Sequence, residues 1–203
     1  MSAPTPMSIA GARLHPGLLT PSAQKAMLED VREIVRAAPL FTPVTPGGRP
    51  MRVRMTSAGR YGWCSDRRGY RYESRHPAGG AWPPIPRSIL DTWFAVSGTD
   101  RLPDCCLVNH YAEDARMGLH QDRDEADFAY PVVSISLGAT ATFRIGGTRR
   151  QDPTRSFPLA SGDVLVLEGP ARLAFHGVDR IRKGPNPLTP GGGRINLTLR
   201  VVD

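Results

Sequence analysis

Cysteine, lysine and long apolar runs are scarce in this sequence of 203 residues. Cys64, Cys105 and Cys106 form an odd set without CxxC spacing, which argues against a disulfide framework or a zinc knuckle. We therefore expect reduced, structural thiols. No apolar run approaches the length that spans a bilayer, and the opening segment lacks the basic and apolar regions of a secretory signal. These absences predict a cytoplasmic protein with no membrane segment.

Size and composition favour one domain that is rich in turns. A chain of 203 residues and 22.1 kDa suits a single domain, 1–203, with a core of its own. Its 21 glycines and 20 prolines predict many turns, which favour short strands over long helices. Nothing in the sequence indicates more than a monomer.

Two helices are expected ahead of the main run of strands. Residues 1–20 are rich in proline and predict a loose leader. Residues 21–40 place apolar side chains at helical intervals behind Ser22, a favourable N-cap residue, and predict an amphipathic helix. A second helix is predicted for RSILDTWFAVSG, where Gly98 would end it.

The segment between these helices, residues 41–87, is the most basic part of the chain. Its runs FTPVTPGGRPMRVRMTSAG and GWCSDRRGYRY predict two exposed hairpins around glycine turns. Residues 49–87 carry nine arginines against Asp66 and Glu73, a net charge of +7 that equals the charge of the whole chain. Four aromatic residues are interleaved with them: Tyr61, Trp63, Tyr70 and Tyr72. Arginine neutralises phosphates and aromatic faces stack on unpaired bases, so the segment suits a nucleic-acid surface, with a merely solvated basic hairpin as the alternative.

Short strands dominate the chain from about Cys105 onward. Six apolar runs are separated by Gly, Pro and Asp: CLVNHY, YPVVSISL, ATFRIGG, DVLVLE, RLAFHGV and INLTLRVV. Such a series after two helices predicts an α+β, mainly β fold whose strands form a jelly-roll barrel buttressed by the helices. Residues 88–203 would then hold the second helix and the barrel core.

The last of these strands, RINLTLR, alternates strictly between apolar and polar residues. One face would present Ile195, Leu197 and Leu199, and the other Arg194, Asn196, Thr198 and Arg200. If the polar face pointed outward, it would be an ordinary solvated surface. Inside a barrel, the two guanidinium groups could instead bind a dicarboxylate, because arginine pairs with carboxylates in a bidentate manner.

Two histidines and an aspartate have the spacing of an iron site. Two histidines and one carboxylate leave open positions on Fe(II) for an organic acid and dioxygen. His120 and Asp122, two residues apart, would share one side of a strand, and His176 would end a later strand. The HxD pair alone is a weak signal, since chance often supplies it. Its order ahead of His176 and the two C-terminal arginines makes the signal specific.

Several motifs together resemble the AlkB family of iron(II) and 2-oxoglutarate-dependent dioxygenases. The core motifs are NHYAEDARMGLHQDRDE, SISLGATATFRIGG, FHG and RINLTLR. Upstream, TPGGRPMRVRMTSAG, GWCSDRRGYRY and AWPPIP resemble the nucleotide-recognition lid of bacterial AlkB repair enzymes, so the likeness extends from about Phe41 to the end. The resemblance implies a double-stranded β-helix core with a lid over residues 41–87.

The resemblance also implies a role for each of twelve residues. Fe(II) would be bound by His120, Asp122 and His176. The co-substrate 2-oxoglutarate would be held by Asn109, Tyr111, Arg194, Asn196 and Arg200. The damaged base would contact Trp63, Tyr70, Asp124 and Arg150, with Asp124 accepting from its exocyclic amine. Glu125 and Asp127, in the same acidic cluster, receive no role.

The implied reaction is oxidative removal of alkyl groups from ring nitrogens of bases such as 1-methyladenine and 3-methylcytosine. It consumes 2-oxoglutarate and O2 and releases formaldehyde, and the substrate would be single- or double-stranded DNA, with RNA as a further possibility. Two alternatives stay open: a dioxygenase of the same type acting on a small molecule or a protein, and a non-enzymatic, cupin-like module that binds nucleic acid. Leu167 departs from the bacterial pattern, which has an aromatic residue near the substrate pocket, so the range of lesions is left open.

Overall fold

The computed structural model describes residues 5–203 and contains two α-helices and thirteen strands. The helices are α1 (Pro21–Ala37) and α2 (Arg87–Val96). The strands are β1 (Met7–Ile9), β2 (Ala12–His15), β3 (Val53–Gly59), β4 (Gly62–Asp66), β5 (Gly69–Glu73), β6 (Cys105–Tyr111), β7 (Met117–His120), β8 (Val132–Gly138), β9 (Ala141–Ile145), β10 (Arg155–Leu159), β11 (Val164–Leu167), β12 (His176–Ile181) and β13 (Arg194–Arg200). The prediction of a mainly β fold with two helices is confirmed.

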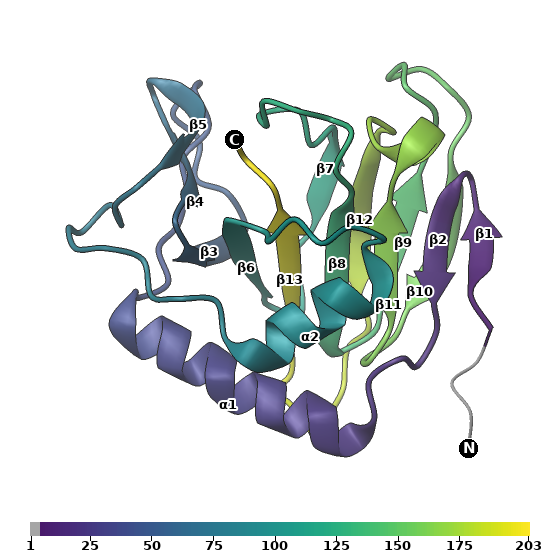
Figure 1. Cartoon of the computed structure of the whole chain (residues 1–203), viewed down its shortest axis with the longest axis horizontal. Coiled ribbons are helices and arrows are strands. Elements are labelled where there is room, and N and C mark those ends of the chain that lie inside the picture. Colours follow the sequence, from purple (N-terminus) through teal and green to yellow (C-terminus); the bar gives the residue numbers. More distant parts are fainter. Residues whose placement is uncertain (1–4) are drawn as a thin grey trace.

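Two antiparallel sheets form the body of the protein (Figure 1). The larger sheet has seven strands in the order β1-β2-β11-β8-β13-β6-β3, and the smaller has four in the order β10-β9-β12-β7. A separate hairpin, β4–β5, stands at one end of the larger sheet. Because the chain crosses repeatedly between the sheets, residues that are distant in sequence meet in the space between them.

The central strands of the larger sheet, β6, β8, β11 and β13, are buried on both faces. On β13, Leu197 and Leu199 point toward α1 and α2 and pack with Ile34 and Trp93 of those helices. The opposite face, which carries Leu107 and Leu165, packs with residues of the smaller sheet such as Phe143. The polar side chains of β13 share this second face and are therefore enclosed between the sheets rather than solvated.

The N-cap of helix α1 lies two residues earlier than its sequence signal indicated. The Thr20 hydroxyl accepts a hydrogen bond from the Ala23 amide at 3.2 Å, so Thr20 is the N-cap and Pro21 occupies the first helical position. Ser22, the expected cap, lies inside the helix. Helix α2 ends as predicted, since Gly98 beyond it has a φ of +71°. Within residues 5–203, neither helix is long and apolar enough to span a membrane.

Two expectations for the N-terminal half were wrong. Residues 5–20 are not a loose leader, because β2 pairs with β11 and extends the larger sheet; residues 1–4 lie outside the described part. Only the second of the two hairpins in residues 41–87 is separate from the sheets. In the first, β3 pairs along its full length with β6, and its Val53 and Met55 are buried.

Candidate active site

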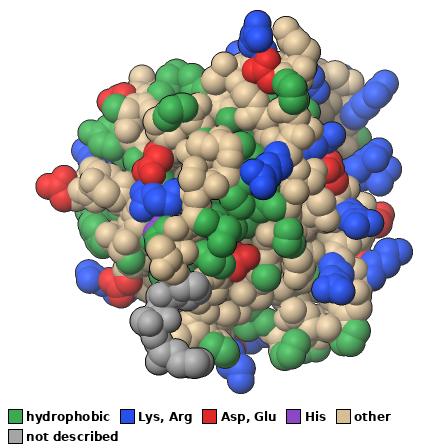
Figure 2. Space-filling view, turned by 90° about the vertical axis from the view of Figure 1, so that its right-hand side faces the viewer, with side chains coloured by type: hydrophobic (Ala, Val, Ile, Leu, Met, Phe, Trp, Pro, Cys, Tyr) green, Lys and Arg blue, Asp and Glu red, His purple; other side chains and the backbone are tan. Residues whose placement is uncertain are grey.

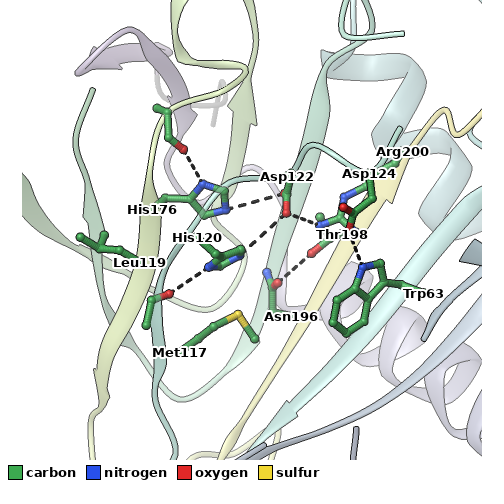
Figure 3. Close-up of polar contacts among 12 residues, drawn as sticks. Trp63, Met117, Leu119, His120, Asp122, Asp124, His176, Asn196, Thr198 and Arg200 are labelled. Atoms are coloured by element: carbon green, nitrogen blue, oxygen red, sulfur yellow. Dashed lines mark hydrogen bonds and ion pairs between the residues drawn. The ribbon is translucent and has the colours of Figure 1, made fainter. Parts of the chain in front are cut away.

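Three potential metal ligands meet at one end of the space between the sheets. His120 is the last residue of β7 and pairs with His176, the first residue of β12. Asp122 lies two residues beyond the end of β7, and the ligand atoms of the three residues all lie within 4.8 Å of one another. Figure 3 shows the three side chains converging. Their convergence was predicted, but His176 begins its strand rather than ending it, and Asp122 lies outside a strand.

Backbone contacts prepare both imidazole rings for metal binding. Nδ1 of His120 is 3.0 Å from the Gly118 carbonyl, and Nδ1 of His176 is 2.9 Å from the Ala174 carbonyl. A carbonyl can only accept, so each Nδ1 carries the hydrogen and each Nε2 keeps its lone pair for a metal. Burial and the neighbouring His120 lower the pKa of His176 to about 4, which keeps this ring neutral at pH 7.

Asp122 is ionised in spite of its burial. Burial alone would raise the pKa of its carboxyl group, but Arg200 and the two histidines outweigh that effect and hold the pKa below its ordinary value. Nη2 of Arg200 lies 2.8 Å from Oδ1 of Asp122. The cluster thus combines two imidazoles with one carboxylate, the ligand set that suits Fe(II) with open positions.

Gly177 is required by the close approach of β12 and β7. A Cβ atom at this position would lie 2.6 Å from the Met117 carbonyl oxygen and 2.9 Å from that of Gly118. Any side chain would push β7 away from β12 and separate His120 from His176. This contact explains why glycine follows the histidine in FHG.

Polar residues of β13 and β6 line the other end of the same space. Asn196 pairs with Asn109 and Arg194 with Tyr111 across the two strands, so these four side chains share one face. Asn196 donates to Ser134 Oγ at 2.8 Å, which fixes its amide. Burial raises the pKa of Tyr111 to about 12, so its hydroxyl stays protonated and can donate.

In the described part of the chain, Arg194 is a buried cation without a carboxylate partner. Its side chain contacts three neutral oxygens, those of Ala139 and Leu159 at 3.3 and 3.2 Å and Oγ of Ser136 at 2.7 Å. Its Nε is buried with no hydrogen-bond partner, and no acid of residues 5–203 forms an ion pair with it. Burial lowers the pKa of Arg194 to about 10. A carboxylate delivered to this end of the cavity would supply the missing partner.

The opposite wall is formed by the β4–β5 hairpin. Trp63 and Tyr70 stack with ring centroids 5.5 Å apart and planes inclined by 17°. Nε1 of Trp63 donates to Oδ2 of Asp124 at 2.9 Å. Across the opening, Arg150 donates to the Leu119 carbonyl at 2.9 Å and lies over the ring of Phe175. Aromatic faces, a carboxylate and a guanidinium group therefore surround the entrance.

All twelve residues singled out in the sequence line one cavity of about 720 Å³. The cavity is also lined by residues that the sequence did not indicate, among them Met51, Met55, Met117 and Ser134. Methionines carry no motif that would mark them as pocket residues. Ser134 could have been found, because it alternates with the apolar residues of β8 and faces the polar side of β13.

Comparisons with known proteins agree with this geometry. The family model of the 2OG-Fe(II) oxygenase superfamily matches residues 11–200. The chain belongs to this superfamily. The oxygenase is 58% identical over 193 residues to an alpha-ketoglutarate-dependent dioxygenase AlkB homolog of Caulobacter vibrioides, an alignment that covers 95% of this chain and 88% of the relative. It is 40% identical to the alpha-ketoglutarate-dependent dioxygenase AlkB of Escherichia coli, in an alignment that covers 88% of this chain and 85% of the relative. The solved structure of OsALKBH1 superposes with a TM-score of 0.79 at 31% identity and covers 97% of this chain and 100% of that one.

The protein is therefore an AlkB-type oxygenase that uses Fe(II), 2-oxoglutarate and O2. Two features of the structure fit these groups independently of the comparisons. The two imidazoles and the carboxylate of Asp122 fit Fe(II), and the unpaired guanidinium group of Arg194 fits a carboxylate.

The oxygenase also contains a buried ionic cluster that the sequence did not reveal. The Glu125 side chain is 1% exposed, and its Oε2 lies 3.1 Å from Nη2 of Arg172. Arg172 also donates to the carbonyls of Asp122 and Tyr130, both at 2.7 Å. It thereby fixes the loop that carries Asp122. The two partners are 47 residues apart, so no local pattern in the sequence predicts their contact.

Proposed function

We propose that this AlkB-type oxygenase repairs nucleic acids by oxidative removal of alkyl groups from the ring nitrogens of bases such as 1-methyladenine and 3-methylcytosine in DNA. The observation that carries the proposal is the shared cavity. It is lined by the three potential metal ligands, by Arg194 and by the aromatic residues of the β4–β5 hairpin. A metal site alone would serve any substrate, but a stacked Trp63–Tyr70 pair beside Asp124 suits a planar base with an exocyclic amine.

His120, Asp122 and His176 are proposed to bind Fe(II), which leaves the remaining positions for 2-oxoglutarate and dioxygen. When bound, these groups supply the oxidative decarboxylation to succinate and carbon dioxide and the oxidising power for hydroxylation of an alkyl carbon. The hydroxylated N-methyl group then leaves as formaldehyde: its C–N bond breaks, the electron pair stays on the ring nitrogen of the base, and the hydroxyl proton is released. No nucleophilic side chain is needed for that collapse.

Arg194 is proposed to pair with one carboxylate of 2-oxoglutarate, since it is a buried cation that has no acidic partner among residues 5–203. Tyr111, Asn109 and Asn196 line the cavity beside it and offer neutral hydrogen-bonding groups to the same molecule. Arg200 lies next to Asp122 at the metal end, where it can contact the other part of 2-oxoglutarate. Anchoring at both ends fixes the orientation of the co-substrate.

Asp124 is proposed to read the exocyclic amine of the base. Within residues 5–203, Trp63 is its hydrogen-bond donor and engages Oδ2, which leaves Oδ1 able to accept from a substrate. Trp63 and Tyr70 would frame the base, and Arg150 would lie on the substrate side of the opening. The base must leave its stack to reach this depth, at a cost of a few kcal/mol that is smaller for a lesion that cannot pair.

The surface charge supports a nucleic-acid substrate. Five exposed arginines of the segment 41–87 form no ion pair with any acid of residues 5–203: Arg49, Arg52, Arg54, Arg67 and Arg75. Figure 2 shows Lys and Arg side chains gathered along one margin of the face that it views. Exposed cations also occur on and after β10 and β12: Arg155, Arg180, Arg182 and Lys183. Such groups bind the phosphate backbone irrespective of sequence.

We also propose the finer architecture of the protein. The two facing sheets would be the double-stranded β-helix, or jelly-roll, barrel of a single domain, with residues 41–87 as its nucleotide-recognition lid. The enzyme would act as a cytoplasmic monomer on single- or double-stranded DNA and also on RNA. Three buried cysteines without disulfides fit a reducing compartment.

The decisive experiment supplies the Fe(II)-loaded protein with 2-oxoglutarate, air and a single-stranded oligonucleotide that contains one 1-methyladenine. Mass spectrometry follows the oligonucleotide, and succinate is measured in the same samples. We expect the loss of one methylene mass per lesion, with a requirement for 2-oxoglutarate and no loss with Asp122→Ala. The unmethylated oligonucleotide is the matched substrate control.

The two products separate the candidate functions. Succinate without any change in the oligonucleotide would reject the repair assignment and favour a small-molecule or protein substrate. Absence of both products from an iron-loaded sample would reject the proposed metal site. A steeply salt-dependent binding of DNA with no turnover would favour a non-enzymatic binding module.

A further inference from the structure

The β4–β5 hairpin is attached to the metal-site loop at two neighbouring points. Trp63 on β4 and Tyr72 on β5 are cross-strand partners, so their side chains lie side by side on one face of the hairpin. Trp63 donates to Asp124, and the hydroxyl of Tyr72 donates to Oε1 of Glu125. One pair of aromatic residues thus contacts two consecutive acids of the loop that follows β7.

The second contact continues into Arg200. Nη1 of Arg200 donates to the Tyr72 hydroxyl at 3.3 Å, so this hydroxyl accepts from Arg200 and donates to Glu125. Nε of Arg200 is 3.3 Å from Oε1 of Glu125, an ion pair whose geometry is too poor for a hydrogen bond. Nη2 of the same guanidinium group is 2.8 Å from Asp122. Arg200 therefore connects the hairpin on one side with a metal-site residue on the other.

The charges in this cluster balance without external ions. Arg172 and Arg200 face Glu125 and Asp122, and all four side chains are at most 8% exposed. In such a cluster, each group is held in place by its partners, because a buried charge that loses one partner is strongly penalised. Tyr72 is the member that comes from the hairpin, so a displacement of the hairpin removes one of the contacts that orient Arg200.

We propose that Tyr72 and Glu125 are positioning residues that couple the hairpin to the 2-oxoglutarate site through Arg200. The inference rests on the proposed function, in which Arg200 contacts 2-oxoglutarate and the hairpin contacts the base. A nucleic-acid strand whose base stacks on Trp63 and Tyr70 would hold the hairpin against the loop of residues 122–125. The Tyr72 hydroxyl then keeps its hydrogen bond with Arg200. Nucleic acid and 2-oxoglutarate then each tighten the binding of the other, because coupling between two sites is reciprocal.

The test uses Tyr72→Phe, which removes one oxygen and keeps the ring. The matched control is Tyr61→Phe, which removes a hydroxyl that donates to the carboxylate of Asp203 at 2.7 Å, away from Arg200. Binding of 2-oxoglutarate to each Fe(II)-loaded protein is titrated without oxygen by calorimetry, with and without the 1-methyladenine oligonucleotide. Thermal unfolding of each variant verifies that it is folded.

Without oligonucleotide, we expect Tyr72→Phe to weaken 2-oxoglutarate binding by about 5-fold to 10-fold, the effect of one typical hydrogen bond, and Tyr61→Phe to bind normally. With oligonucleotide, the wild type should bind 2-oxoglutarate at least about 5-fold more tightly. Tyr72→Phe should show little of that gain. A merely structural role for Tyr72 would lower thermal stability but leave the gain unchanged.

The outcomes distinguish this inference from the proposed function. If the wild type demethylates the oligonucleotide in air but Tyr72→Phe binds 2-oxoglutarate as the wild type does, the coupling is rejected and the repair function stands. If the wild type neither binds nor demethylates the oligonucleotide, the repair function fails. In that case the oligonucleotide-free titration alone decides whether Tyr72 positions Arg200.

Discussion

Replacement of Arg194 by methionine tests whether its charge serves folding or ligand binding. Burial lowers the pKa of Arg194 from its ordinary value to about 10, which corresponds to roughly 3 kcal/mol of unfavourable free energy in the folded state. Because the folded pKa lies below the unfolded one, this cost is present at every pH below about 10 and is relieved only above it. Methionine fills a similar volume without a charge and removes the cost.

The substitution also removes three contacts. The carbonyls of Ala139 and Leu159 and the hydroxyl of Ser136 lose their donor, at roughly 1 kcal/mol each. The two effects nearly cancel, so we expect Arg194→Met to unfold within about 4 °C of the wild type when no ligand is present. Ligand binding should behave differently. An excess of 2-oxoglutarate of about 100 times its Kd stabilises a protein by about 2.7 kcal/mol, or about 5 to 10 °C for a chain of this size.

The assay is thermal unfolding of the Fe(II)-loaded protein without oxygen, with and without 2-oxoglutarate. The wild type should show the ligand-induced rise in Tm and Arg194→Met should not. Arg13→Met is the control, because Arg13 pairs with Glu168 and is absent from the cavity lining. A rise that persists in Arg194→Met would refute the assignment of this residue to a carboxylate. A fall of more than about 10 °C without ligand would show that the charge is needed for folding.

Four further results follow from single contacts. Gly177→Ala should weaken iron binding about 10-fold or more, as judged by competition with a chelator, because its Cβ would force β7 and β12 apart. Trp63→Phe keeps the stacked ring but leaves Asp124 without its donor, so KM for the oligonucleotide should rise about 3-fold to 10-fold with little change in kcat; an unchanged KM would show that this hydrogen bond is unimportant. Arg52→Gln should reduce the slope of log Kd against log salt for single-stranded DNA by about 0.7, whereas a constant slope would place Arg52 away from the phosphates. Burial raises the pKa of the Cys64 thiol to about 11, so a thiol reagent at pH 8 should modify it only after unfolding, and rapid labelling of the native protein would contradict its burial.

The parts of the site that sequence could predict are those encoded by order and alternation. The strict alternation of RINLTLR separated the apolar and polar faces of this strand correctly. The structure then decides between the two arrangements left open, with the apolar face against the helices and the polar face in the cavity. The order of His120, Asp122 and His176 along the chain also predicted that these three side chains lie together. One predicted strand was wrong: RLAF before His176 has the apolar composition of a strand but lies in a turn after a short 3-10 helix, Gly169–Ala171.

The parts that failed depend on contacts between distant segments. The arginines that flank Val53 led to the prediction that β3 belongs to an exposed hairpin. In the structure, Val53 and Met55 of this strand are buried against the cavity. Residues 5–20 were mistaken for a leader because β2 has only four residues and finds its partner, β11, about 150 positions later. Glu125 received no role because its partners come from β5, β13 and the segment before β12. Only the folded chain brings these opposite charges together.

The three tryptophans of the chain differ in their surroundings in a way that creates an optical probe. Trp82 and Trp93 are buried and do not line the cavity. Trp63 is half-buried, stacks on Tyr70 and donates a hydrogen bond to Asp124. Trp63 is thus the indole whose emission must respond when another aromatic group enters between or beside these rings. The protein carries a built-in fluorophore at the entrance to its cavity, so the arrival of a base can be timed in a stopped-flow instrument without a dye, separately from the chemistry that follows.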